Sequence, residues 1–92
     1  MKAAEWIDRA KAVRGWTSDY AVSKELGITR GALSQIRTGK TVTLGDDMAI
    51  KVAQAIGERP EAIIIDQTAE RVKAPAVRAA LFDAAHRLCI LC

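Results

Sequence analysis

The chain of 92 residues contains little proline, glycine, cysteine or aromatic residue: two prolines, six glycines, two cysteines and 4% aromatic side chains. The low proline and glycine content, with 50% hydrophobic residues, excludes collagen-like and disordered chains. The two cysteines, Cys89 and Cys92, are too few and too close together to staple a secreted fold. The length falls within the ~50 to 250 residues typical of a domain, so we expect one compact domain.

Long apolar runs are also missing from the sequence. No stretch reaches the ~18 to 20 apolar residues that span a bilayer, and Glu5, Asp8 and Arg9 interrupt the region where the apolar core of a signal peptide would lie. These absences, together with the few cysteines, predict a cytoplasmic protein without a membrane partner.

Recognisable catalytic motifs are absent as well. The sequence has no nucleophile elbow and no glycine-rich phosphate loop. Cys89 and Cys92 have a metal-like spacing, but His86 is the single histidine, and a zinc site needs about four ligands. We therefore expect no enzyme activity, no metal and no cofactor.

Positive charge is concentrated in the first half of the chain. The net charge is +3, and residues 1–45 carry eight basic and four acidic side chains, whereas residues 46–92 sum to −1. The asymmetry favours a polyanion-binding surface on the first half. An ordinary solvated basic surface is the alternative on charge alone.

Apolar spacing and helix-capping residues predict an all-α fold. In the first segment, Ala3, Trp6, Ile7, Ala10 and Val13 recur at helical steps up to Gly15. Further helices are expected from Ser18 or Asp19 to Gly27, from Thr29 to Gly39, from Asp46 to Gly57, from Pro60 to Val72, and from Pro75 to the end of the chain. A short strand at 63–65 is an alternative, but no second β-branched run exists to pair with it.

The segment from Asp19 to Thr38 has the pattern of a helix-turn-helix. Gly27 suits the positive φ of a tight turn, and Ile28 fills the space between the two helices. Leu33 and Ile36 bury one side of the second helix. The side chains expected on its outer side are polar or small: Arg30, Gly31, Ser34, Gln35, Arg37 and Thr38.

Residues 21–41, AVSKELGITRGALSQIRTGKT, resemble the helix-turn-helix of the lambda-repressor and Cro class of phage regulators. The resemblance covers roughly residues 3–72 and extends to small phage-encoded repressors, including those of filamentous prophages. It implies a five-helix DNA-binding domain at 1–72 that acts as a transcriptional repressor. Such a repressor binds double-stranded DNA as a homodimer, on an operator with twofold symmetry.

The resemblance also implies site residues. Base-reading positions are Thr29, Arg30, Gly31, Ser34 and Gln35. Gly31 departs from the family, which usually has a polar side chain there. Phosphate-binding positions are Ser18, Tyr20, Lys24, Arg37, Thr38, Lys40, Thr41 and Thr43. Asp19 would repel a phosphate, so it is interpreted mainly as a helix cap.

The segment 73–92 predicts a C-terminal amphipathic helix. Its apolar side includes Val77, Leu81, Ala84, Leu88 and Leu91 as dimerisation residues. The same helix could instead pack on its own domain, and both can be true in part.

A second function class stays open from the sequence. An antitoxin-like or adaptor module would use these helices to bind a protein, with DNA binding secondary. The identity of such a partner, a toxin or an antirepressor, is not encoded in any motif.

Overall fold

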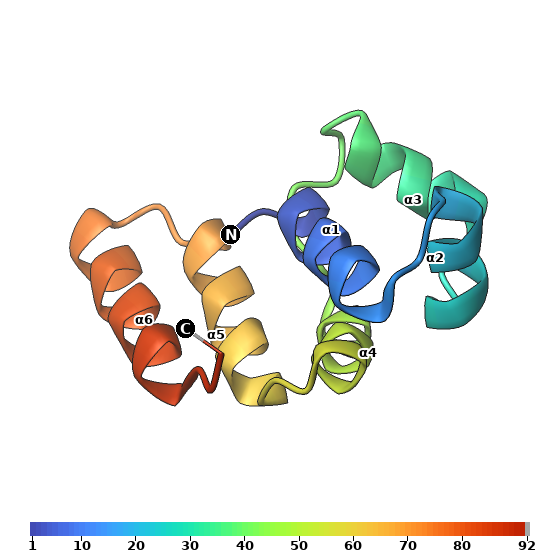
Figure 1. Cartoon of the computed structure of the whole chain (residues 1–92). Helices are drawn as coiled ribbons and strands as arrows, with labels where there is room; N and C mark the ends of the chain where they lie inside the picture. Colours follow the sequence, from blue (N-terminus) through green and yellow to red (C-terminus); the bar gives the residue numbers. More distant parts are fainter. Residues whose placement is uncertain (92) are drawn as a thin grey trace.

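The computed structural model describes residues 1–91 and consists, over that range, of helices and loops without a strand (Figure 1). The helices are α1 (Ala3–Arg14), α2 (Asp19–Leu26), α3 (Arg30–Arg37), α4 (Asp46–Ile56), α5 (Pro60–Arg71) and α6 (Pro75–Leu88). The all-α prediction is confirmed, and residues 63–65 lie within α5. Among the described residues, every helix is too short or too polar to cross a bilayer.

Helix ends follow from local chemistry. Ser18 and Thr29 precede α2 and α3, and their side-chain oxygens accept hydrogen bonds of 3.1 Å from the backbone N–H groups of Ala21 and Ala32. Gly27 and Gly57 end α2 and α4 with φ of +66° and +76°, a left-handed conformation that glycine adopts without steric cost. The cap of α2 is therefore Ser18, and the interpretation of Asp19 as the cap was wrong.

The core lies between α1, α4 and the helices around them. Ala3, Trp6, Ile7 and Ala10 of α1 are buried, as predicted. Val13, expected on the same stripe, is 56% exposed. Residues 12–15 are all exposed, so the last turn of α1 projects beyond the side chains that cover the rest of the helix.

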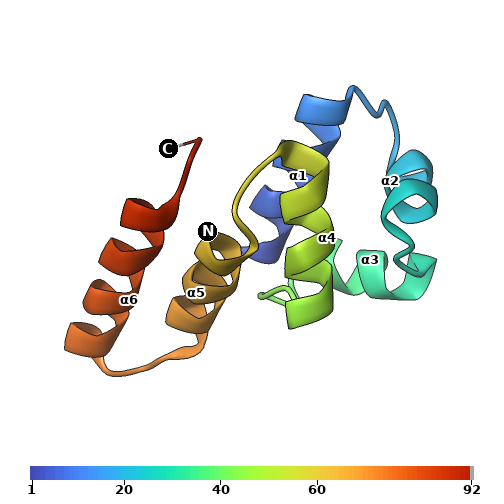
Figure 2. The same ribbon diagram turned by 90° about the horizontal axis from the view of Figure 1, so that it is seen from below.

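Helix α6 packs beside α5, on the side of the molecule opposite α2 and α3 (Figures 1 and 2). The guanidinium of Arg78 donates to the carbonyl oxygens of Ala69, Glu70 and Val72 at 3.0 to 3.3 Å, which satisfies the end of α5. The helix ends at Leu88, short of the predicted chain end. Leu91 therefore lies outside it, and Cys92 lies outside the described residues.

The carboxylate of Glu58 holds the segment that follows α6. It accepts hydrogen bonds from the backbone N–H groups of Arg59 at 2.7 Å, Ile90 at 2.8 Å and Leu91 at 3.1 Å. Burial pushes the pKa of Glu58 upward, but the three amides outweigh it and lower the pKa. Glu58 thus connects the start of α5 to the end of α6.

A buried glutamine connects α5 to the loop after α3. Gln67 is 1% exposed, and its Oε1 accepts from the N–H of Leu44 at 2.7 Å. Its Nε2 donates to the Met1 carbonyl oxygen at 2.6 Å and to Asp66 Oδ2 at 2.9 Å. Asp66 also accepts from Trp6 Nε1 at 3.1 Å. This network fixes the loop that leads away from α3 against the core.

We predict that Gln67→Leu lowers the free energy of unfolding by about 1 to 3 kcal/mol, because it leaves the buried Leu44 N–H without an acceptor. Urea denaturation monitored by circular dichroism measures the change. Gln54→Leu, at an exposed position of α4, is the matched control and should change stability by less than about 0.5 kcal/mol. Equal losses in the two variants would contradict the role of Gln67.

Candidate nucleic-acid interface

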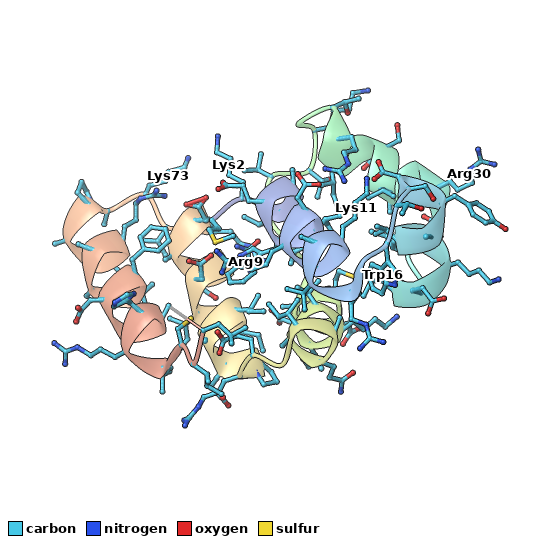
Figure 3. All side chains as sticks on the ribbon, viewed as in Figure 1. Lys2, Arg9, Lys11, Trp16, Arg30 and Lys73 are labelled. Carbon is cyan, nitrogen blue, oxygen red and sulfur yellow. The ribbon has the colours of Figure 1, made fainter. Side chains whose placement is uncertain are left out.

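Helix α3 has two chemically different sides. Leu33 and Ile36 are 5% and 6% exposed and are its buried residues. The base-reading positions predicted from the sequence are all exposed: Thr29, Arg30, Gly31, Ser34 and Gln35. Ala32, which the polar pattern of α3 did not indicate, is exposed too. Arg30 projects away from the body of the molecule (Figure 3).

The turn between α2 and α3 sets the position of α3. The N–H of Ile28 donates to the Ser23 carbonyl oxygen at 3.1 Å, and the Ser23 hydroxyl donates to the Ile28 carbonyl oxygen at 2.5 Å. Ile28 itself is 7% exposed. The predicted roles of Gly27 and Ile28 are therefore confirmed: one makes the turn, and the other fills the space beneath it.

The loop after α3 folds back onto Gln35. The Thr41 N–H donates to the Gln35 carbonyl oxygen at 3.0 Å, and the Thr41 hydroxyl donates to Gln35 Oε1 at 3.3 Å. Thr38 Oγ1 donates to the same carbonyl at 3.3 Å. The side-chain contact with Thr41 restrains the amide of Gln35 and leaves its Nε2 hydrogens directed elsewhere.

Arg71 anchors the same loop and was missed from the sequence. Its Nε donates to Thr43 Oγ1 at 3.0 Å, and its guanidinium also donates to the Leu44 carbonyl oxygen. These partners lie 28 and 27 positions earlier in the chain, so no local pattern could have indicated them. The hydroxyl of Thr43 keeps its own hydrogen for a further acceptor.

The start of α2 and the outer side of α3 enclose a shallow groove of about 330 Å³, to which Tyr20, Arg30 and Ser34 contribute. Tyr20 is 70% exposed. Other predicted phosphate-binding positions are exposed as well: Ser18, Lys24, Thr38 and Lys40. Lys24, however, lines a different hollow, formed with α1 and α4. The structure thus brings together the start of α2, α3 and the following loop, and separates Lys24 from them.

Arg37 requires a correction, because it is not a free cation on the outer side of α3. Its Nε and Nη2 lie 2.9 Å from the two carboxylate oxygens of Asp19, and Nη2 lies 2.8 Å from Asp8 Oδ1. The hydrogen bond with Asp19 raises the pKa of Arg37, and the same bond lowers the pKa of Asp19. Arg37 therefore joins α3 to α2 through a bidentate pair with Asp19, and to α1 through a single contact with Asp8.

Comparison with known proteins gives no match to this chain among protein-family models, curated proteins or solved structures. Within residues 1–91, no group of three or more histidine, cysteine, aspartate or glutamate residues could hold a metal ion.

We predict that Asp19→Asn lowers stability at pH 7 by up to ~1 kcal/mol, since the pair with Arg37 is partly exposed. The pKa of Asp19 is lower in the folded state than in the unfolded state. The ionised carboxylate therefore makes its full contribution to the free energy of unfolding above the unfolded-state pKa of ~3.9, and this contribution is lost as the pH falls through the folded-state pKa. The difference in free energy of unfolding between wild type and Asp19→Asn should therefore become smaller below pH ~4. Urea denaturation across a pH series measures it.

Asp83→Asn is the control, because Asp83 makes an exposed pair with Arg87 within α6. It should change stability by less than ~0.5 kcal/mol. A difference for Asp19→Asn that stays constant from pH 7 to pH 2 would refute the assigned ion pair.

Proposed function

We propose that this protein is a sequence-specific DNA-binding transcriptional repressor of phage or prophage type. In this proposal α2 and α3 form a helix-turn-helix of the lambda-repressor class, within a five-helix domain at 1–72. The observation that carries it is the division of α3: Leu33 and Ile36 are buried, and every expected base-reading residue is exposed. A helix with a bare polar side fits the major groove of B-DNA.

The side chains of α3 can discriminate between bases. Arg30 can donate to O6 and N7 of guanine, and Gln35 can pair with N6 and N7 of adenine, each pairing contributing ~1 to 3 kcal/mol of discrimination. The exposed methyl group of Ala32 suits apolar contact with the thymine methyl. Thr29 and Ser34 add short hydroxyl groups.

Gly31 allows the backbone of α3 to approach the DNA. A Cβ added at this residue would meet no atom within 4 Å, so packing inside the protein does not require glycine here. Glycine in a helix costs ~1 kcal/mol relative to alanine. Close approach to a base or phosphate accounts for a residue that neither packing nor helix propensity favours.

Phosphates would be bound on both sides of α3. The backbone amides at the start of α2, with Ser18 and Tyr20, contact one strand. Thr38, Lys40, Thr41 and Thr43 in the following loop contact the other. Arg37 orients α3 against α2, and Lys24 adds to the basic field from its separate position.

A second copy of the chain would bind through α6. Val77 is 48% exposed, and Leu81, Ala84 and Leu88 are only half-buried although α6 packs on α5. Leu91, 51% exposed, follows the helix. A homodimer with twofold symmetry places its two copies of α3 on half-sites separated by ~34 Å or a multiple of it. Occupying a promoter in this way blocks polymerase.

An operator sequence can be obtained by selecting bound duplexes from random DNA. We predict that two substitutions weaken binding to this operator in different ways. Gln35→Ala should weaken operator binding by ~1 to 3 kcal/mol and leave affinity for random DNA unchanged, because it removes a base contact. Lys40→Ala should weaken both DNAs alike and lower the slope of log affinity against log salt by ~1, because it removes a phosphate contact. Fluorescence anisotropy across a salt series measures both.

Lys73→Ala is the control for Lys40→Ala, since Lys73 is an exposed lysine between α5 and α6, far from α3 (Figure 3). It should leave operator affinity and the salt slope close to wild type. Failure of the selection to enrich any sequence, or equal losses on both DNAs for Gln35→Ala, would contradict base reading by α3.

Dimerisation gives a separate prediction. Val77→Asp should shift the protein from dimer to monomer at micromolar concentration, because a carboxylate would be buried without a partner at the interface. Ala79→Asp places the same charge on an exposed residue of α6, at a different angle around the helix. Sedimentation velocity should detect a dimer for Ala79→Asp and wild type. A dimer for Val77→Asp would overturn the assignment of the interface.

A further inference from the structure

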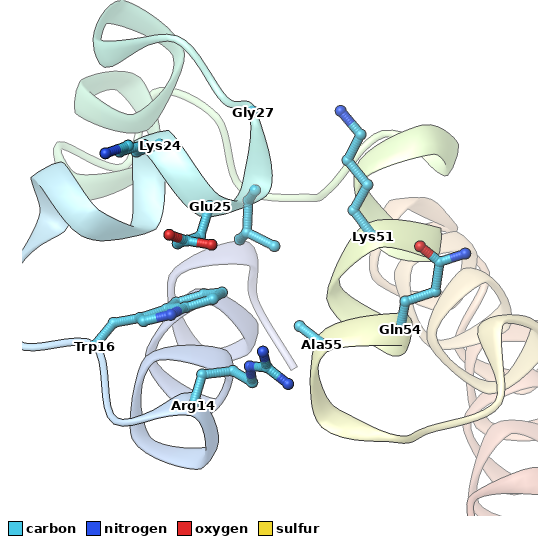
Figure 4. Close-up of a pocket in the computed structure, with 9 residues that line it drawn as sticks. Arg14, Trp16, Lys24, Glu25, Gly27, Lys51, Gln54 and Ala55 are labelled. Carbon is cyan, nitrogen blue, oxygen red and sulfur yellow. The ribbon is translucent and has the colours of Figure 1, made fainter.

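A second hollow lies away from the outer side of α3, where the ends of α1 and α2 face α4 (Figure 4). Its volume is about 460 Å³, within the ~300 to 1,000 Å³ usual for small-molecule sites. Its polar and aromatic lining comes from Arg14, Trp16, Lys24, Glu25, Lys51 and Gln54. The proposed DNA interface uses none of these residues as a direct contact.

Positive charge dominates this hollow. Arg14, Lys24 and Lys51 come from three different helices, and Glu25 is the one carboxylate that lines it. Among the ion pairs of the described residues, none includes any of the three cations. Arg14 points toward α4, whereas Lys24 extends away from the centre (Figure 4). The Lys51 amine extends toward Gly27, so Arg14 is the cation whose charge enters the hollow, and the two lysines add positive charge at its edges.

Trp16 gives the hollow an aromatic wall. The two tryptophans differ: Trp6 is 3% exposed and donates to Asp66, whereas Trp16 is half-buried and borders the open space. A partly exposed indole beside cations can stack a planar ring. Glu25 lies on the same side as Trp16, and Lys51 and Gln54 lie on the α4 side (Figure 4).

We propose that this hollow binds a nucleoside phosphate. The base stacks on Trp16, and the phosphate groups bind Arg14 and Lys51. Glu25 accepts a hydrogen bond from a ribose hydroxyl or an exocyclic amine, and the Gln54 amide can both donate and accept. A free nucleotide and a nucleotide within a single strand present the same base and phosphate chemistry, so both are sources of this ligand.

Isothermal titration of the full chain, without duplex DNA, tests the site with four probes: ATP, adenosine, tripolyphosphate and a single-stranded DNA hexamer. ATP should bind more tightly than adenosine or tripolyphosphate, because it alone combines the ring and the phosphate chain. Trp16→Ala should weaken ATP binding by about 10-fold or more. Trp16→Phe keeps an aromatic ring against the core and should retain most of the affinity.

Lys51→Gln changes an exposed side chain and so tests the phosphate contact without disturbing the core. It should weaken ATP and tripolyphosphate binding several-fold, and Lys73→Gln, the matched control, should weaken neither. The hexamer distinguishes the two sources of the ligand. If the hexamer binds much more tightly than ATP and Trp16→Ala weakens its binding, the ligand is a single strand. If the hexamer binds as tightly as ATP or more weakly, the ligand is a free nucleotide.

Two results would overturn the site. One is no binding of ATP or the hexamer at millimolar concentration. The other is equal binding of ATP and tripolyphosphate that Trp16→Ala leaves unchanged, which would reduce the hollow to a solvated basic surface. Because duplex DNA is left out, either result is independent of the proposed repressor function.

Discussion

The insertion of Leu33 and Ile36 into the core is the interaction on which the proposed interface depends. Helix α3 has eight residues, a length at which an isolated helix is not stable in water. Burial of two such side chains stabilises by ~1.5 to 3 kcal/mol each. At the start of the helix, the Thr29 hydroxyl accepts a hydrogen bond from the Ala32 N–H. At its end, the ion pairs of Arg37 with Asp8 and Asp19 hold α3 against α1 and α2. On the outer side of α3, Gln35 and Arg37 contact other parts of the protein, whereas Arg30 and Ser34 are exposed and available to a ligand.

The remaining helices keep this arrangement in place and separate it from other surfaces. Gln67 and Arg71 of α5 hold the loop after α3, so the C-terminal end of that helix is fixed against the core. Arg78 and Glu58 hold α6 on α5, at the opposite end of the molecule from α2 and α3 (Figures 1 and 2). The two surfaces that we propose for a second copy of the chain and for DNA therefore lie at opposite ends of the molecule.

Local features of the sequence predicted the helices well, but they could not predict contacts between residues that are distant in the chain. Ser18, Thr29, Gly27 and Gly57 act through neighbouring residues, so their effect on helix ends can be read from spacing alone. The partners of Arg37, Arg71 and Glu58 come from distant segments, and nothing in the local pattern distinguishes a paired arginine from a solvated one. The exposure of Val13 depends on where neighbouring helices end. Trp16 is a single aromatic residue in a loop, so it belongs to no periodic pattern from which its position in the hollow could be predicted.

We propose that the outer side of α3 contacts DNA. The most direct test of this proposal is a two-dimensional amide NMR titration of the protein with a duplex selected from random DNA. We expect the largest chemical-shift changes in residues 18–20, 29–35 and 38–43, with α6 little changed apart from any effect of dimerisation. Changes confined to other helices, with the amides of Arg30 to Gln35 unmoved by a duplex that binds, would contradict it.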